Sequence, residues 1–144
     1  MAESIVREKS YAFSLMVINL CQGLTQEKEY VLSRQLLKSG TSIGANVEEA
    51  LAGQSRKDFI SKMAIASKES RETIYWLRLL RDSGLAKPDA VSDLLDEAKA
   101  LSRILTSIVK TTKETLPAAS LGCIPSDGPS SPFSSNSKPN TQHS

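Results

Sequence analysis

The segment from Leu36 to Leu80 constrains the fold more than any other part of the chain. It holds two glycines about one turn apart, Gly40 and Gly44, and then a break at residues 53–55. Beyond the break, apolar and small residues recur every three or four positions without a slip, at Phe59, Met63, Ala66, Ser70, Thr73, Leu77 and Leu80. A sustained period of 3.5 is typical of the seam of a left-handed helical bundle. The segment therefore predicts two neighbouring helices of a bundle.

The two glycines fall inside a helix that we expect to follow an N-cap at Thr25 and to end at Ala52. A glycine inside a helix costs about 1 kcal/mol against alanine, so the pair is explained if another backbone comes close. A kink or break near Gly40 is the alternative, and we favour close packing. We expect the small residues of this helix to meet the narrow middle of the next one, that is, Ser39, Gly40 and Gly44 against Ala66, Ser70 and Thr73.

Three further helical boundaries are readable after the break. Ser55 is a predicted N-cap with Asp58 three residues later, as in a capping box, and Gly84 is the predicted stop. Pro88 suits the first turn of a fourth helix, which we expect over residues 89–115. The apolar seam of this fourth helix comprises Val91, Leu94, Ala98, Leu101, Leu105 and Ile108.

The first helix, expected from about Ser4 to Gln22 and ending at Gly23, is apolar on nearly every face between Ala12 and Cys21. A helix on one side of a bundle needs an apolar stripe of only about three positions in seven. Either this helix is very deeply buried, or it touches a second surface. In so small a domain that surface is most easily another subunit, and we expect self-association.

Four helices joined by short loops predict an all-α domain, an antiparallel up-down-up-down left-handed four-helix bundle over residues 1–116. Residues 117–144 are rich in Ser and Pro, with one acid and one base. Such a composition cannot bury enough apolar surface to fold alone, so we predict a disordered C-terminal tail. The first residues lack the layout of a signal peptide, and no apolar stretch reaches the roughly 18 residues of a membrane span. We expect a cytoplasmic protein with no membrane partner.

The residues of the predicted bundle argue against an enzyme. The one histidine, His143, lies in the tail, which removes Ser-His and Cys-His pairs and most zinc sites. The carboxylate pairs at 48–49 and 96–97 lack the Glu-x-x-His motifs of di-iron bundles, and no phosphate-binding loop occurs. Cys21 is expected in the core, and Cys123 is incidental. We predict no catalytic residue, no cofactor and no metal, with an unrecognised carboxylate catalyst as a minor alternative.

Basic residues are the more informative set, although the formal net charge is only +2. On the third helix, Lys68, Arg71, Tyr75 and Arg78 recur at spacings of three and four and form one stripe. An aromatic ring between cations suits single-stranded nucleic acid, because cations contact phosphates and a ring stacks on a base. Arg56 and Lys57 precede this stripe at the start of the helix. The competing interpretation is a solvated face, partly neutralised by Glu72 and Asp82 four residues beyond Lys68 and Arg78. A second stripe on the fourth helix, Lys99, Arg103, Lys110 and Lys113, fits a solvated face better.

Three stretches, residues 42–50, 55–60 and 72–77, resemble the four helix bundle protein family, within a similarity that covers about Ser10 to Lys113. That family includes proteins encoded in intervening sequences of bacterial 23S ribosomal RNA genes, and the accessory variability proteins of diversity-generating retroelements look similar in fold. The resemblance implies a homopentameric barrel, RNA or DNA binding on a basic surface, and a reverse transcriptase as a partner. Many members carry two adjacent arginines where this chain has Leu37 and Lys38, which weakens a basic patch on the second helix.

We therefore predict an oligomer, a pentamer by resemblance, that binds RNA or DNA without sequence specificity or supports a reverse transcriptase. Its predicted nucleic-acid contacts are Arg56, Lys57, Lys68, Arg71, Tyr75 and Arg78. The alternative is a structural or protein-interaction oligomer with no nucleic-acid role, whose partner surface is the apolar excess of the first helix.

Overall fold

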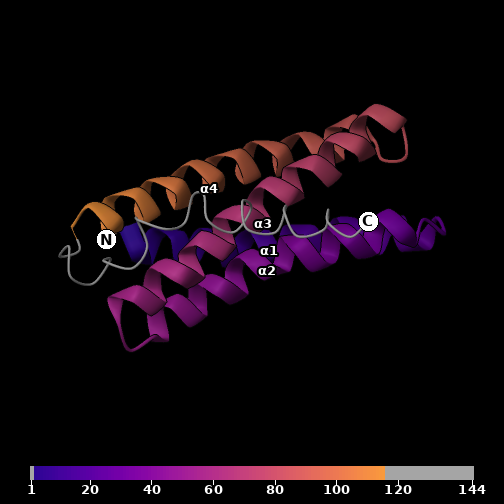
Figure 1. The fold of residues 1–144 in the computed structure, drawn as a ribbon. Helices are drawn as coiled ribbons and strands as arrows, with labels where there is room; N and C mark the ends of the chain where they lie inside the picture. Colours follow the sequence, from indigo (N-terminus) through magenta and orange to yellow (C-terminus); the bar gives the residue numbers. More distant parts are fainter. Residues whose placement is uncertain (1, 116–144) are drawn as a thin grey trace, which may run out of the picture. The chain divides into compact units, whose positions relative to one another are not determined.

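The computed structural model describes residues 2–115 and contains four α-helices over that range (Figure 1). They are α1 (Ala2–Gln26), α2 (Val31–Ala52), α3 (Arg56–Ser83) and α4 (Pro88–Glu114). None of the described residues lies in a β-strand. The predicted all-α four-helix bundle is confirmed. The predicted disorder of residues 117–144 and the incidental role of Cys123 concern residues outside the described range, and the domain boundary at residue 116 stays a prediction.

The helices follow chain order around the bundle, and a contact joins each neighbouring pair. Arg7 of α1 binds Glu48 of α2 at 3.1 Å, and Ser39 of α2 accepts a hydrogen bond from Thr73 of α3 at 2.9 Å. Between α3 and α4, the hydroxyl oxygens of Ser67 and Thr106 lie 3.2 Å apart. Between α1 and α4, Lys9 forms a salt bridge with Glu97 at 3.5 Å. Arg7 lies near the start of α1 and Glu48 near the end of α2, and the short loops reverse the chain between consecutive helices, which are therefore antiparallel.

The boundary between α1 and α2 differs from the sequence prediction. Helix α1 continues through Gly23 to Gln26, and the chain reverses at residues 27–30, where Lys28 has a left-handed φ of 64°. Thr25 therefore lies in α1 and does not cap α2. The Glu29 carboxylate accepts a hydrogen bond from the Leu32 backbone N–H at 2.9 Å and satisfies one of the free donors at the start of α2. Gly23 is tolerated because Leu24, the next residue, is buried in the core.

The predicted boundaries of α3 are confirmed. The Ser55 hydroxyl accepts a hydrogen bond from the Asp58 backbone N–H at 3.0 Å, and Ser55 itself has the extended backbone of an N-cap. The helix ends before Gly84, whose φ of 78° is a left-handed conformation that glycine adopts without strain. Pro88 is the first residue of α4, as expected.

The Ser55→Ala substitution removes the side-chain acceptor of this cap and should lower the free energy of unfolding by about 1 kcal/mol. Urea denaturation monitored by circular dichroism measures the change. Ser61→Ala, on an exposed position of the same helix, is the matched control and should change stability by less than about 0.5 kcal/mol. Equal losses in the two variants would show that the Ser55 hydroxyl does not cap α3.

The small residues of α2 allow close contacts on two sides. Helix α2 is continuous through Gly40, so the alternative of a break is excluded and the favoured close packing is confirmed. A Cβ atom added to Gly40 would lie 2.9 Å from a methyl carbon of Val17 on α1. The glycines thus face α1, whereas we had expected the whole small set to face α3. Only Ser39 fulfils that expectation, through its hydrogen bond to Thr73.

The distances between helix backbones depend on the size of the side chains between them. Helix α2 lies close to both α1 and α3, with Cα atoms within 8 Å of each other, whereas α4 keeps a larger distance from its neighbours. The seam of α4 is built mainly of leucines and other long aliphatic side chains, which hold the helix axes further apart. The bundle is therefore tight around α2 and more open along α4.

The core comprises the apolar stripes of all four helices. The predicted seam residues of α3 and α4 are buried, except that Phe59 and Ile108 are only half-buried. Cys21 is buried, as predicted, and its thiol donates a weak hydrogen bond to the Ser33 carbonyl at 3.4 Å. Burial raises the pKa of the Cys21 thiol, which keeps it protonated and unreactive.

Candidate nucleic-acid interface

The predicted stripe on α3 is exposed along its whole length. Lys68, Arg71, Tyr75 and Arg78 are all exposed, and because α3 is unbroken their spacing places them on one side of the helix. Half of the Tyr75 side chain (51%) is exposed to solvent. Its ring meets the Trp76 ring edge to face, with 5.1 Å between centroids. A tyrosine held in this way still offers apolar surface on which a planar group can stack.

The expected neutralisation of this stripe is wrong. Glu72 accepts a hydrogen bond from the Trp76 indole N–H at 3.2 Å instead of pairing with Lys68. Asp82 pairs with Arg81, its neighbour in the chain, at 2.7 Å instead of with Arg78. The Arg81 guanidinium lowers the pKa of the Asp82 carboxyl. Among the described residues, Lys68 and Arg78 form no salt bridge, although Glu72 and Asp82 stay beside the stripe and the charge of Arg78 also contributes to the lowered pKa of the Asp82 carboxyl.

Arg56 and Lys57 are exposed at the N-terminal end of α3, away from the stripe. Arg56 lines a depression beside Thr112 of α4. Fifteen residues separate Arg56 from Arg71, which corresponds to about 22 Å along a helix. The structure therefore brings four of the six predicted residues together and places the other two at the end of the same helix.

Cations of α4 join the α3 stripe across the seam between the two helices. Two adjoining depressions of about 570 and 370 Å³ open on this seam, and they share Thr106 and Lys110. The basic residues that line them are Arg71 of α3 and Lys99, Arg103, Lys110 and Lys113 of α4. No Asp or Glu is among the described residues that line either depression. We call this surface the α3/α4 groove.

Hydroxyl groups form the floor of the α3/α4 groove. Ser67 of α3 lies 3.2 Å from Thr106 of α4, oxygen to oxygen, and Arg71 donates a hydrogen bond to the Ser67 hydroxyl at 3.0 Å. This bond uses one N–H of the guanidinium and holds the Arg71 side chain against the seam. The other donors of the guanidinium are directed to no carboxylate among the described residues, and a fork of this kind suits phosphate oxygens.

The α4 cations line the α3/α4 groove, although the sequence favoured a solvated face for them. Lys99, Arg103 and Lys110 recur at spacings of four and seven, which defines one side of a helix but not the neighbour that this side meets. The sequence does contain a hint of this position. Lys99 directly follows the seam residue Ala98, and Arg103 lies two residues after the seam residue Leu101. Residues beside a seam border the next helix, so cations there line a groove.

A second exposed surface is apolar and lies on α1. Tyr11, Leu15 and Ile18 recur at spacings of four and three, and they are 64%, 52% and 38% exposed. Leu37, one turn before Gly40 on α2, is also exposed. Phe13 is enclosed and Met16 is half-buried, so the bundle covers only part of the apolar excess of α1. The alternative of complete burial of this helix is therefore excluded, and self-association stays a prediction.

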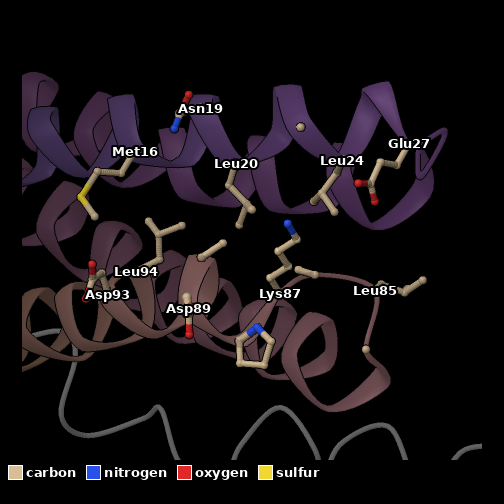
Figure 2. Close-up of a pocket in the computed structure, with 15 residues that line it drawn as sticks. Met16, Asn19, Leu20, Leu24, Glu27, Leu85, Lys87, Asp89, Asp93 and Leu94 are labelled. Carbon is tan, nitrogen blue, oxygen red and sulfur yellow. The ribbon is translucent and has the colours of Figure 1, made fainter.

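A depression of about 650 Å³ lies between the C-terminal part of α1 and the start of α4. Figure 2 shows Leu20 and Leu24 of α1 pointing toward Leu94 and Lys87 on the opposite side. Glu27, Asp89 and Asp93 add negative charges to the positive charge of Lys87. Leucines with mixed charges bring together no nucleophile and base, so this depression offers no chemistry of its own.

Two further properties of the described residues bear on function. Within residues 2–115, no group of three or more His, Cys, Asp or Glu side chains is arranged to hold a metal ion. None of the described helices combines the length and the apolar character that crossing a membrane requires.

The relatives of the chain agree with its fold. Residues 2–107 match the family model of the 23S rRNA-intervening sequence proteins. A crystal structure of a protein of unknown function from the S23 ribosomal protein family, from Bacteroides thetaiotaomicron, is 41% identical in sequence, with a TM-score of 0.74. The match covers 76% of this chain and 99% of that one. Among curated proteins, none matches this chain. This chain belongs to the 23S rRNA-intervening sequence protein family.

Proposed function

We propose that this protein is a non-enzymatic, self-associating bundle that binds RNA or DNA without sequence specificity through α3 and its seam with α4. One observation carries the proposal: five basic side chains line the α3/α4 groove, and no carboxylate lines it among the described residues. Uncompensated cations that gather along a surface are the electrostatic footprint of a polyanion site. Lys68, Tyr75 and Arg78 extend that surface along α3.

The proposed roles follow from the chemistry of each side chain. Lysines act as point charges on phosphates, and Arg71 contacts phosphate oxygens through its remaining N–H groups. Tyr75 provides a ring on which a base stacks. Arg56 and Lys57 contact phosphates at the end of α3. These contacts reach the backbone and the faces of bases but read no base edges, so binding should be independent of sequence.

Binding of this kind should weaken steeply with salt, because bound cations release counterions from the nucleic acid. Fluorescence anisotropy with labelled ribosomal RNA fragments, at about 50 and 200 mM salt, measures the effect. Arg71→Glu combined with Arg78→Glu should reduce affinity by about tenfold or more at the lower salt. It should also make the slope of log affinity against log salt shallower by about 1.4, for two lost contacts to a single strand.

Lys28→Glu combined with Lys87→Glu is the matched control, since it makes the same charge change at two exposed residues outside the groove. Its affinity for RNA should stay within about twofold of that of the unmodified protein, because salt screens charges that lie far from the bound RNA. Circular dichroism melting establishes that both variants are folded. Unchanged affinity in the Arg71/Arg78 variant would contradict the proposed interface.

A second function is favoured by the apolar surface of α1. A structural or protein-interaction oligomer, with no nucleic-acid role, would use Tyr11, Leu15 and Ile18 as its contact surface, and the basic residues would only keep it soluble. Absence of RNA and DNA binding at low salt, in a protein that still self-associates, would select this function. A scaffold for a reverse transcriptase combines both surfaces, and co-purification with such an enzyme would test it.

A further inference from the structure

We propose that the α3/α4 groove binds a single strand of nucleic acid more tightly than a duplex, an inference that rests on the proposed function. The α4 cations define the length of the site. Lys99 and Lys113 are fourteen residues apart on one unbroken helix, which corresponds to about 21 Å. At the 3.4 Å per nucleotide of a stacked strand, this length spans about six nucleotides, and fewer if the strand is extended.

The side chains of the groove favour a single strand. Ile74 lines it beside cations, and Tyr75 is exposed on the adjoining face of α3. A duplex keeps its bases paired and stacked inside, so it could contact the cations but could offer no base face to Ile74 or Tyr75. A single strand can place its phosphates against the cations of α4 and turn its bases toward α3.

The lining of the groove matches the two halves of a nucleotide. Hydroxyl groups lie at the centre, where Ser67 is buried and Thr106 is exposed, and the Thr106 hydroxyl can donate to a phosphate oxygen while it accepts from Ser67. Ile74, which is half-buried, lines the same depression as Lys99 and Arg103. An apolar side chain beside two cations offers a base a dry surface next to a contact for its phosphate. A site for phosphates alone would have no use for an isoleucine there.

Affinity for matched oligonucleotides tests this inference. The probes are a labelled single-stranded RNA of about twelve nucleotides and a blunt RNA duplex of the same strand with its complement, at about 100 mM salt. The unmodified protein should bind the single strand at least about tenfold more tightly than the duplex. Arg103→Glu combined with Lys110→Glu should reduce single-strand affinity by about tenfold or more, and the Lys28→Glu, Lys87→Glu control should stay within about twofold.

The outcomes separate this inference from the function on which it rests. Equal or tighter binding of the duplex, still sensitive to salt and to the Arg71/Arg78 variant, would overturn the single-strand inference and leave the proposed function standing. A loss in the Arg103/Lys110 variant no larger than in the control would likewise remove the groove from the site. Absence of binding to either probe at low salt would overturn both.

Discussion

Replacing Gly40 with valine is expected to lower the free energy of unfolding by about 3 kcal/mol, the upper end of the usual cost of overpacking a core. A Cβ atom at this position already lies 2.9 Å from a Val17 methyl carbon, closer than real contacts allow. Valine would add two methyl groups in a space that the Val17 side chain of α1 already fills. The helices cannot absorb them without moving apart, because α2 is also held against α3 through Ser39 and Thr73.

Chemical denaturation measures this loss, and Gly23→Ala is the control. Nothing lies within 4 Å of a Cβ atom added to Gly23, which is also inside a helix. That variant should therefore be more stable by about 0.5–1 kcal/mol, since it removes only the helical penalty of glycine. Adding Val17→Ala to Gly40→Val should recover part of the lost stability, as neighbours that share one space are coupled. Similar behaviour of the two glycine variants would contradict the close approach of α1 and α2.

The helix boundaries show what the sequence can and cannot predict about the fold. The heptad of α3, the cap at Ser55 and the stop at Gly84 are local patterns, and all three were predicted correctly. Gly23 and Gly84 look alike in the sequence, yet only Gly84 ends a helix. The difference arises from Leu24, whose burial depends on the packing of α1 against the rest of the bundle. Packing between helices is a property of the whole fold, and a local pattern does not contain it.

The same contrast between local patterns and packing between helices applies to the candidate site. The spacing of Lys68, Arg71, Tyr75 and Arg78 was enough to predict a common stripe on one helix. The partners of the charges were not predictable from spacing, because Glu72 and Asp82 each had a competing donor, Trp76 and Arg81. The contribution of α4 depends on which of its sides faces α3, and only the assembled bundle decides that. Local charge patterns are therefore readable, whereas the grooves that they line are not.

Ile18→Glu is expected to dissociate the protein into single subunits, which light scattering would record as a mass of 15.6 kDa. The expectation rests on the proposed self-association through α1. Burying an isoleucine side chain contributes about 1.5–3 kcal/mol, and a carboxylate left unpaired in the contact opposes association further. Together these effects raise the dissociation constant by about 100-fold or more. Unmodified protein should have a mass several times larger at micromolar concentration.

Ile65→Glu is the matched control, because Ile65 and Ile18 are the same residue type, each 38% exposed, on different helices. The control should keep the mass of the unmodified protein. A monomeric unmodified protein, or equal dissociation in both variants, would contradict the role of the α1 surface.

The dissociated Ile18→Glu variant also links the two surfaces of the molecule. The helices follow chain order around the bundle, so the exposed side of α1 and α2 lies opposite the seam of α3 and α4. The proposed association through α1 would therefore leave every α3/α4 groove accessible and repeat it once per subunit. A long RNA can then engage several grooves at once, which raises its apparent affinity without any new contact. The Ile18→Glu variant should lose most of its affinity for long RNA and retain its affinity for a twelve-nucleotide strand, whereas the Arg103→Glu, Lys110→Glu variant should lose both and remain assembled.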